Sequence, residues 1–270
     1  MNILGILNIT TDSFSDGGRY LEPSAALAQA HKLAADGAAI LDIGAASSHP
    51  AAKAVAPEIE IARLDAVVPA LKARAIPLSI DTFAPQVQRW ALGQGVDYLN
   101  DIHGFPDAAL YPELAASSCG LIVMHAVQPS GVAVRTEIPP SEIWDRILRF
   151  FDIRLDALTR AGIARTRIIL DPGMGQFLGS DVENSLIVLR RLPELKARYG
   201  LPILVSLSRK GFLRKLTGQP IAAIGPASLA AELFAEANGA DFIRTHDPAA
   251  LRDGLKVLKA IGKDAGPGSP

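Results

Sequence analysis

The chain is poor in cysteine and has no surplus of charge, and each shortage excludes a class of protein. Its 270 residues include one cysteine, Cys119, which excludes an internal disulfide framework and a multi-cysteine metal cluster. Lys and Arg number 27 against 28 Asp and Glu, whereas a nucleic-acid platform normally carries a basic excess. Aromatic residues make up only 6% of the chain, which argues against a base-stacking role.

Long apolar runs are also missing. No run reaches the roughly 18 residues that a membrane span needs. The first residues, MNILGILNIT, have no basic segment and reach Asn8 too soon for a signal peptide. We therefore expect a cytoplasmic protein of enzyme size that binds neither membrane nor nucleic acid and buries a core without a disulfide or metal.

What the chain does contain is a repeated alternation of short apolar runs with amphipathic segments. The runs are almost continuously apolar, which is typical of buried parallel strands. They are Ile3–Leu7, Ala39–Ile43, Pro77–Ile80, Tyr98–Leu99, Leu121–Met124, Arg167–Leu170, Ile203–Val205 and Phe242–Ile243. Helices are predicted at Pro23–Asp36, Pro57–Arg74, Ser141–Ala161, Glu183–Tyr199, Pro226–Asn238 and Pro248–Ile261, with another opened by Pro85.

The polar residues that follow these strands recur about every 34 residues, a normal length for a strand–helix unit. Eight such units predict an α/β fold, a (β/α)₈ TIM barrel, as a single domain over residues 1–262. Residues 263–270 are expected to be a disordered tail. A doubly wound open sheet is the alternative, but no GxGxxG motif follows the first strand.

In such barrels the active site forms at the carboxyl ends of the strands, and the polar residues gather there. One group is acidic or amide and consists of Asp81, Asn100 and Asp171. It suits a ligand with an amidine-like N–H edge, which carboxylates grip with paired hydrogen bonds. A second group is cationic and rich in donors, which suits a phosphate. Its members are Arg209, Lys210, Arg244 and His246.

Each of these residues also has a purely structural explanation. An Asp or Asn at a strand end often caps the next helix, and Ser208 could cap a helix that starts at Arg209. A lone histidine such as His103 is more often a satisfied or surface residue, and Cys119 is more often a small apolar filler. The structural explanation weakens because so many polar residues fall at the same end of the predicted barrel.

The motifs along the chain resemble those of the dihydropteroate synthase family. GILNITTDSFSDGG at Gly5–Gly18 resembles the N-terminal motif, and DIG at Asp42–Gly44 with SSHP at Ser47–Pro50 resembles the second loop. The remaining motifs follow in the family's order: SIDT at Ser79–Thr82, NDI at Asn100–Ile102, VMH at Val123–His125, DPGMG at Asp171–Gly175, SRKGFL at Ser208–Leu213 and RTHD at Arg244–Asp247. The resemblance extends from residue 3 to about residue 260.

The resemblance implies a pterin-binding barrel that condenses 6-hydroxymethyl-7,8-dihydropterin diphosphate with p-aminobenzoate, giving 7,8-dihydropteroate and diphosphate in folate biosynthesis. It assigns the pterin to Asp81, Asn100, Met124, Asp171, Lys210 and Arg244, and the diphosphate to Asn8, Arg244 and His246. Mg²⁺ would be the cofactor, held near Asn8. The p-aminobenzoate side would be formed by Ser47, Ser48, Pro50, Phe177 and Ser208. The catalytic residues would be Asp81, Lys210, Arg244 and His246. We also expect a homodimer.

Departures from the housekeeping pattern all touch the p-aminobenzoate side. Thr11 replaces a proline, the second loop reads AASSHP rather than GESTRP, and DPGMG is followed by Gln176-Phe177-Leu178-Gly179 rather than Phe-Gly-Lys. The chain therefore resembles the mobile-element, sulfonamide-insensitive synthases or a chromosomal relative of them. Phe177 is the best candidate for a block against sulfonamides; the alternative is that it is only a core residue.

Two other functions stay open at this point. A pterin-binding methyltransferase that moves a methyl group from methyltetrahydrofolate to a corrinoid would share the barrel and the carboxylates. It would give no reason for the cationic SRK and RTHD motifs. A non-catalytic pterin-binding barrel is the other alternative, because the second loop is altered.

Overall fold

The computed structural model describes residues 1–10, 22–47, 52, 54–128, 130–132 and 136–263. Within them, eight strands form one sheet in the order β6-β5-β4-β3-β2-β1-β8-β7, and every pair of neighbours is parallel. The strands are β1 (Asn2–Asn8), β2 (Ile40–Gly44), β3 (Leu78–Asp81), β4 (Tyr98–Asp101), β5 (Gly120–Met124), β6 (Ile168–Asp171), β7 (Leu204–Ser206) and β8 (Phe242–Thr245).

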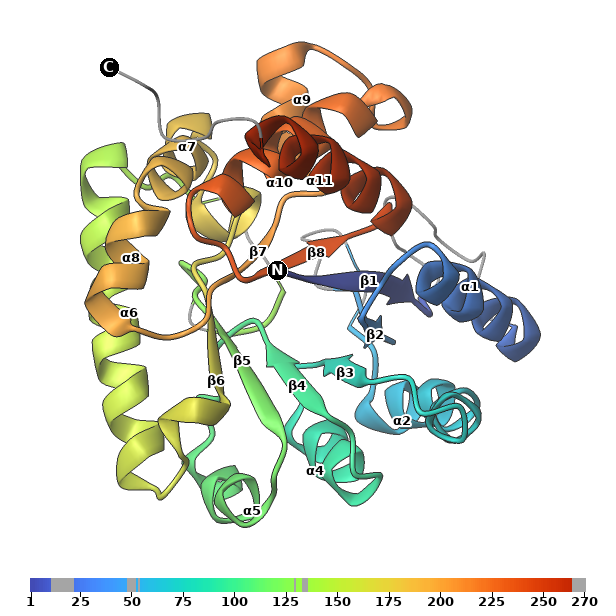
Figure 1. Ribbon diagram of the computed structural model, residues 1–270. Coiled ribbons are helices and arrows are strands. Elements are labelled where there is room, and N and C mark those ends of the chain that lie inside the picture. The colour runs from blue at the N-terminus through green and yellow to red at the C-terminus, as the bar shows by residue number, and fades with distance from the viewer. Residues whose placement is uncertain (11–21, 48–51, 53, 129, 133–135, 264–270) are drawn as a thin grey trace, which may run out of the picture.

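The two ends of this sheet also meet. Leu170 of β6 forms a parallel bridge with Ile203, just before β7, and its N–H donates to the carbonyl of Pro202 at 2.9 Å. The sheet is therefore a closed ring of strands with helices around it (Figure 1). The predicted (β/α)₈ barrel is confirmed.

The helices follow the strands in the predicted alternation. The α-helices are α1 (Pro23–Ala35), α2 (Pro57–Asp65), α3 (Val68–Lys72), α4 (Pro85–Gly93), α5 (Tyr111–Ala116), α6 (Pro140–Arg160), α7 (Val182–Arg190), α8 (Leu192–Tyr199), α9 (Gly211–Thr217), α10 (Gly225–Ala237) and α11 (Pro248–Lys263). Short 3₁₀ turns are η1 (Ala108–Leu110), η2 (Arg165–Arg167), η3 (Gly175–Leu178) and η4 (Ile221–Ala223). None of the described helices is both long and apolar enough to cross a membrane.

Two of the predicted helices are each broken in two. The segment predicted as Pro57–Arg74 forms α2 and α3, and the one predicted as Glu183–Tyr199 forms α7 and α8. In both cases a proline, Pro69 or Pro193, is the second residue of the new helix. Proline cannot donate the helical hydrogen bond and its ring clashes with the preceding turn, so it can start a helix but not continue one.

The barrel interior is closed at its amino end by a layer of apolar side chains. These residues form a cluster separate from the main core, and each comes from a strand: Leu4, Ile40, Ile122, Ile169, Leu204 and Phe242, with Tyr98 packed against them. The larger core lies between the strands and the surrounding helices. Because strand side chains alternate in direction, residues two positions further along each strand also face inward. The side chains of a site at the barrel mouth therefore lie directly above this apolar layer.

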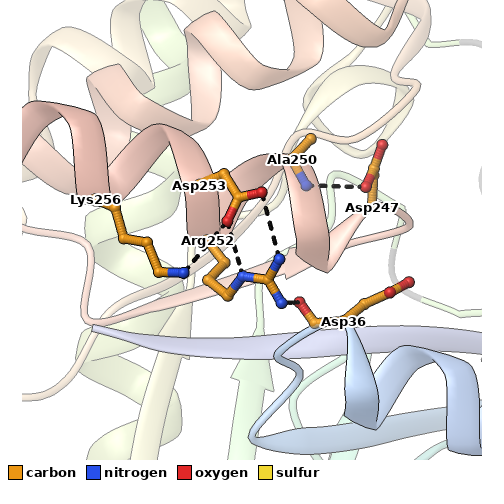
Figure 2. A network of polar contacts seen from close by, with 6 residues as sticks. All are labelled: Asp36, Asp247, Ala250, Arg252, Asp253 and Lys256. Atoms are coloured by element: carbon orange, nitrogen blue, oxygen red, sulfur yellow. Dashed lines mark hydrogen bonds and ion pairs between the residues drawn. The ribbon is translucent and has the colours of Figure 1, made fainter.

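The last helix is tied to the first across the outside of the barrel (Figure 2). The Asp247 carboxylate accepts the N–H of Ala250 at 3.0 Å, which caps the start of α11. The Arg252 guanidinium donates to the carbonyl of Asp36 at 2.9 Å, where α1 ends. The last residue of the RTHD motif thus has a structural role. The boundaries predicted at residue 262 stay untested, because residues 264–270 lie outside the described part of the chain.

Candidate active site

The polar residues of the barrel mouth lie directly above the apolar layer. Five polar residues each follow a residue of that layer by two positions on a strand: Asp42, Asn100, Asp171, Ser206 and Arg244. The apolar Met124 occupies the same level on β5. All except Arg244, which is partly exposed, are buried. Asp81 ends β3 beside them. The structure thus brings together residues from seven strands, as the sequence predicted for one end of the barrel.

Arg244 connects the two groups that the sequence had separated. Its Nε donates to Asp42 Oδ2 at 2.5 Å and its Nη2 donates to Asp81 Oδ2 at 2.7 Å. The side chain of Asp42 is fully buried, and that of Arg244 is only 14% exposed. In this structure Arg244 therefore belongs to the acidic group and neutralises it.

Asn100 completes this group and leaves an acceptor for a ligand. Its Nδ2 lies 3.4 and 3.5 Å from the two carboxylate oxygens of Asp42, so the amide nitrogen faces the carboxylate. Its Oδ1 is buried and accepts no hydrogen bond from the described residues. Ser206 Oγ, in the same layer, is also buried and has no partner within the described ranges. Unsatisfied buried polar atoms are costly, so this pocket is suited to a ligand that supplies complementary hydrogen bonds.

Burial shifts the pKa values of the charged groups at the mouth. It raises the pKa of Asp171 to about 6 and the pKa of Asp81 to about 7, although Arg244 and Lys210 oppose the shift in both cases. It lowers the pKa of Lys210 to about 8, helped by the positive charge of Arg244 and opposed by the two carboxylates. Burial alone would lower the pKa of Arg244, but Asp42 and Asp81 together raise it. Clustered shifts of this kind are typical of functional sites.

The turn after β6 fixes Asp171 in place. Asp171 Oδ1 accepts the N–H of Gly173 at 2.8 Å. Gly173 has a φ of +76°, and a Cβ there would lie 2.3 Å from the carbonyl oxygen of His125, so only glycine fits. The His125 ring braces the same turn, because its Nδ1 lies 3.2 Å from the Pro172 carbonyl, which can only accept. Burial lowers the pKa of His125 to about 4, so it is a neutral structural donor.

Phe177 and Lys210 lie next to each other on one side of the pocket. The Lys210 ammonium is 5.2 Å from the centre of the Phe177 ring, within the range of a cation–π contact. Phe177 also packs in a small cluster with Ile102 and Met124. Both explanations offered for Phe177 are therefore compatible with the structure, since it is buried among apolar residues and borders the charged mouth.

The loops after β7 and β8 are joined through a serine. His246 donates its backbone N–H to Ser208 Oγ at 3.2 Å, and its ring Nδ1 lies 3.0 Å from the same oxygen. Burial lowers the pKa of His246 well below its ordinary value, and the charges of Arg209, Arg244 and Lys210 add to the effect. Ser208, expected on the p-aminobenzoate side, thus contacts the histidine expected on the diphosphate side.

The remaining predicted residues lie at the start of the chain. Asn8 ends β1, and a Cβ on Gly44 would lie 3.6 Å from its Oδ1 and 3.8 Å from Asp81 Oδ2, so Asn8 and Asp81 border the same point. Ser47 follows β2 and is half-buried. Ser48 and Pro50, together with Thr11 and His49, lie outside the described residues.

Sequence reasoning omitted two residues from the candidate set, Asp42 and Ser206. Asp42 is one of the polar residues at the strand ends and part of the DIG motif, but it was not a predicted site residue; in the structure it holds Arg244 and faces Asn100. The signal was its position two residues after Ile40, inside an otherwise apolar strand. A charged residue in a fully buried strand needs an opposite charge nearby, and this rule would have predicted a cationic partner.

The fold and this set of donors and acceptors define an α/β-barrel enzyme whose mouth accepts a polar ligand and an anion. The chain matches the family model described as pterin binding enzyme over residues 4–246. It is 59% identical to the dihydropteroate synthase type-2 of Escherichia coli, over 97% of each chain. It is 48% identical to the type-1 synthase of Pseudomonas aeruginosa, over 97% of this chain and 95% of the relative.

A solved structure agrees with these relatives. The dihydropteroate synthase of Burkholderia cenocepacia, solved in complex with 7,8-dihydropteroate, superposes with a TM-score of 0.86 and 34% identity, covering 98% of this chain and 92% of that one. This chain belongs to the pterin binding enzyme family and, within it, to the dihydropteroate synthases.

We predict that Asp171→Asn stabilises the fold at alkaline pH. Because the pKa of Asp171 is raised in the folded state, the unfolded chain loses this proton first, between about pH 4 and pH 6. Stability therefore falls as the pH rises through that window, and the loss is complete above it. Each pKa unit corresponds to about 1.4 kcal/mol, so the variant should gain about 1–3 kcal/mol at pH 8 and clearly less at pH 5 in urea unfolding.

The matched control is Asp156→Asn, which removes an exposed carboxylate on α6 and should change the free energy of unfolding by less than about 0.5 kcal/mol. A variant at position 171 that is less stable than the wild type at pH 8 would contradict this account of the site.

Proposed function

We propose that this chain catalyses the dihydropteroate synthase reaction and that the residues at the barrel mouth carry it. The supporting observation is the cluster of buried side chains at the barrel mouth, in which Lys210 and Arg244 act on Asp171, and Asn100 and Arg244 both contact Asp42. Acceptors at the floor suit the N–H groups of a reduced pterin. Cations beside them suit the diphosphate that the pterin carries.

In this proposal the protein mainly orients the two substrates and neutralises the charge of the diphosphate. The bond between the pterin methylene carbon and the diphosphate oxygen breaks, and diphosphate leaves with the electron pair. The amine nitrogen of p-aminobenzoate forms the new bond to that carbon and releases a proton to solvent. An aryl amine is nucleophilic without a strong base, so orientation and charge stabilisation carry the catalysis. Arg244, Lys210 and His246 would stabilise the leaving group, while Asp81 and Asp171 would hold the ring.

Asn8 is the proposed ligand of Mg²⁺. Its amide oxygen is a donor of the kind that Mg²⁺ prefers, and it borders the charged mouth beside Asp81. No group of three or more His, Cys, Asp or Glu in the described residues could form a metal site by itself. This agrees with a cation that binds mainly through substrate phosphates and one protein oxygen. When bound, Mg²⁺ would neutralise charge on the diphosphate.

We place p-aminobenzoate on the side of η3 and α9. A cavity of about 340 Å³ there is lined by residues from both, including Gly175, Gln176, Gly211, Phe212 and Lys215. A Cβ on Gly175 would lie 3.7 Å from Lys210 Cδ, so this wall of the cavity adjoins the charged mouth. Lys215 and Lys210 would together attract the carboxylate of p-aminobenzoate.

The proposal predicts that the purified protein releases diphosphate from the pterin diphosphate only when p-aminobenzoate is present. Asp81→Asn should weaken pterin diphosphate binding by about 1–3 kcal/mol, because an amide presents only one acceptor. Calorimetry would measure binding and a coupled assay would measure release.

Tight binding of the pterin diphosphate without release would favour a non-catalytic barrel. Methyl transfer from methyltetrahydrofolate to a corrinoid would favour the methyltransferase. Unchanged pterin affinity in both Asp81→Asn and Asp171→Asn would refute the proposed pocket.

We further propose that Phe177 reduces sulfonamide sensitivity. A sulfonyl substituent projects beyond the volume that a planar carboxylate fills, so a bulky ring near the mouth can exclude it while packing on the flat substrate. Phe177→Gly should lower the sulfonamide inhibition constant about tenfold or more, which is about 1.4 kcal/mol. The KM for p-aminobenzoate should change less.

Phe177→Leu is the companion variant, because it keeps apolar volume against Met124 and should fold even if glycine does not. It should show an intermediate gain in sensitivity. A wild-type enzyme that is inhibited as strongly as housekeeping synthases, or variants that lose both ligands in proportion, would refute this role.

The homodimer is also a proposal. Large apolar side chains are exposed on the neighbouring helices α10 and α11, at Phe234, Val257, Leu258 and Ile261. Such a patch is suited to pairing with a second copy of the same face. Sedimentation equilibrium should give twice the chain mass of 28.5 kDa. Phe234→Asp should shift the equilibrium toward the monomer, whereas Ile153→Asp, which changes an even more exposed apolar residue on α6, should not. A monomeric wild type would refute the dimer.

A further inference from the structure

Ser208 and His246 face each other because of the register between the last two strands. Ser206 of β7 pairs with Arg244 of β8, so the residues two positions further along each chain, 208 and 246, leave the barrel side by side. The bond of His246 N–H to Ser208 Oγ continues this pairing beyond the strands. The contact between the two side chains is therefore determined by how β7 and β8 pair in the barrel.

The hydroxyl of Ser208 has one proton, and because the residue is buried this proton needs a hydrogen-bond acceptor. It already accepts the His246 backbone N–H at 3.2 Å, and Nδ1 of the same residue is 3.0 Å away. Ser208 is buried and has no other polar partner among the described residues. If Nδ1 carried a proton, the hydroxyl would accept twice and its own O–H would be left unsatisfied, which is costly. The arrangement that satisfies every group has the hydroxyl donating to an unprotonated Nδ1.

The charges around His246 favour the same neutral ring. Arg209, Lys210 and Arg244 all lie close enough to oppose a positive charge on it. Arg209 is also held in a strained backbone conformation, with a φ of +60°, and its N–H donates to Ser228 Oγ at 3.0 Å. The loop that carries Ser208 is thus anchored independently of His246.

We propose that Ser208 is a positioning residue that holds His246 as the neutral tautomer with its proton on Nε2. Resting on the proposed synthase function, this gives His246 the role of an uncharged hydrogen-bond donor to the departing diphosphate. A neutral donor that is already oriented costs no proton transfer when charge develops on the leaving group. The hydroxyl, not the serine backbone, carries this role.

Nitrogen NMR of the protein labelled at histidine tests the tautomer directly. In the wild type, Nδ1 of His246 should show the shift of an unprotonated nitrogen and Nε2 that of a protonated one, with the signals assigned by their loss in His246→Gln. In Ser208→Ala these signals should move toward averaged values. A protonated Nδ1 in the wild type would overturn the proposal, whether or not the protein has synthase activity.

Kinetics test the consequence. Ser208→Ala should lower kcat about tenfold, or about 1.4 kcal/mol, while its affinity for a pterin without diphosphate stays within twofold of the wild type. Ser208→Thr, which keeps the hydroxyl, should recover most of the loss. Ser228→Ala removes a similar hydrogen bond from the same loop and should leave the His246 signals unchanged. Wild-type turnover in Ser208→Ala would overturn the role, whereas no turnover in the wild type itself would overturn the synthase function instead.

Discussion

The buried ion pairs of Arg244 are the interaction on which the site depends. Arg244 contacts carboxylates on two other strands, Asp42 of β2 and Asp81 of β3, which lie far away in the sequence. A charge taken out of water is tolerable only when it is paired, and here one cation is shared by two acids. The removal of Arg244 would leave both carboxylates without their ion-pair partner. The three strands must therefore be in register before the mouth can be stable.

The site also has an energetic cost that the apolar layer below it offsets. Asp171 and Asp81 have raised pKa values, so ionisation of either carboxyl in the folded state lowers the stability of the fold. Asn100 Oδ1 and Ser206 Oγ are buried without a hydrogen-bond partner in the part of the chain that the structure describes. Natural enzymes commonly carry such strain where a ligand later relieves it. The burial of the apolar layer beneath the site stabilises the fold and offsets this energetic cost.

Much of this could be predicted from the sequence, because the barrel follows from local patterns. The eight strands are short apolar runs, and their polar ends fall at one face once parallel pairing is assumed. The breaks at Pro69 and Pro193 were predictable in principle but were hidden by the amphipathic pattern that continues across them. The partners of Arg244 were not predictable by spacing, since they depend on how the strands stagger around the ring. Nor was the contact of Ser208 with His246, which depends on the register of β7 and β8.

The geometry of Arg244 also limits how the mouth can handle an anion. A guanidinium has five N–H groups, and here Nε and Nη2 each donate to a carboxylate. Only the N–H groups that remain can turn toward a diphosphate without breaking an ion pair. Most of the neutralisation must therefore come from other groups, such as Lys210, which acts on both Asp171 and His246. A neutral His246 adds a directed donor without adding a charge that the three neighbouring cations would oppose. Asp42 and Asp81 hold Arg244 through ion pairs, so Arg244 cannot by itself neutralise the diphosphate. Lys210 and His246 must therefore contribute to binding the anion.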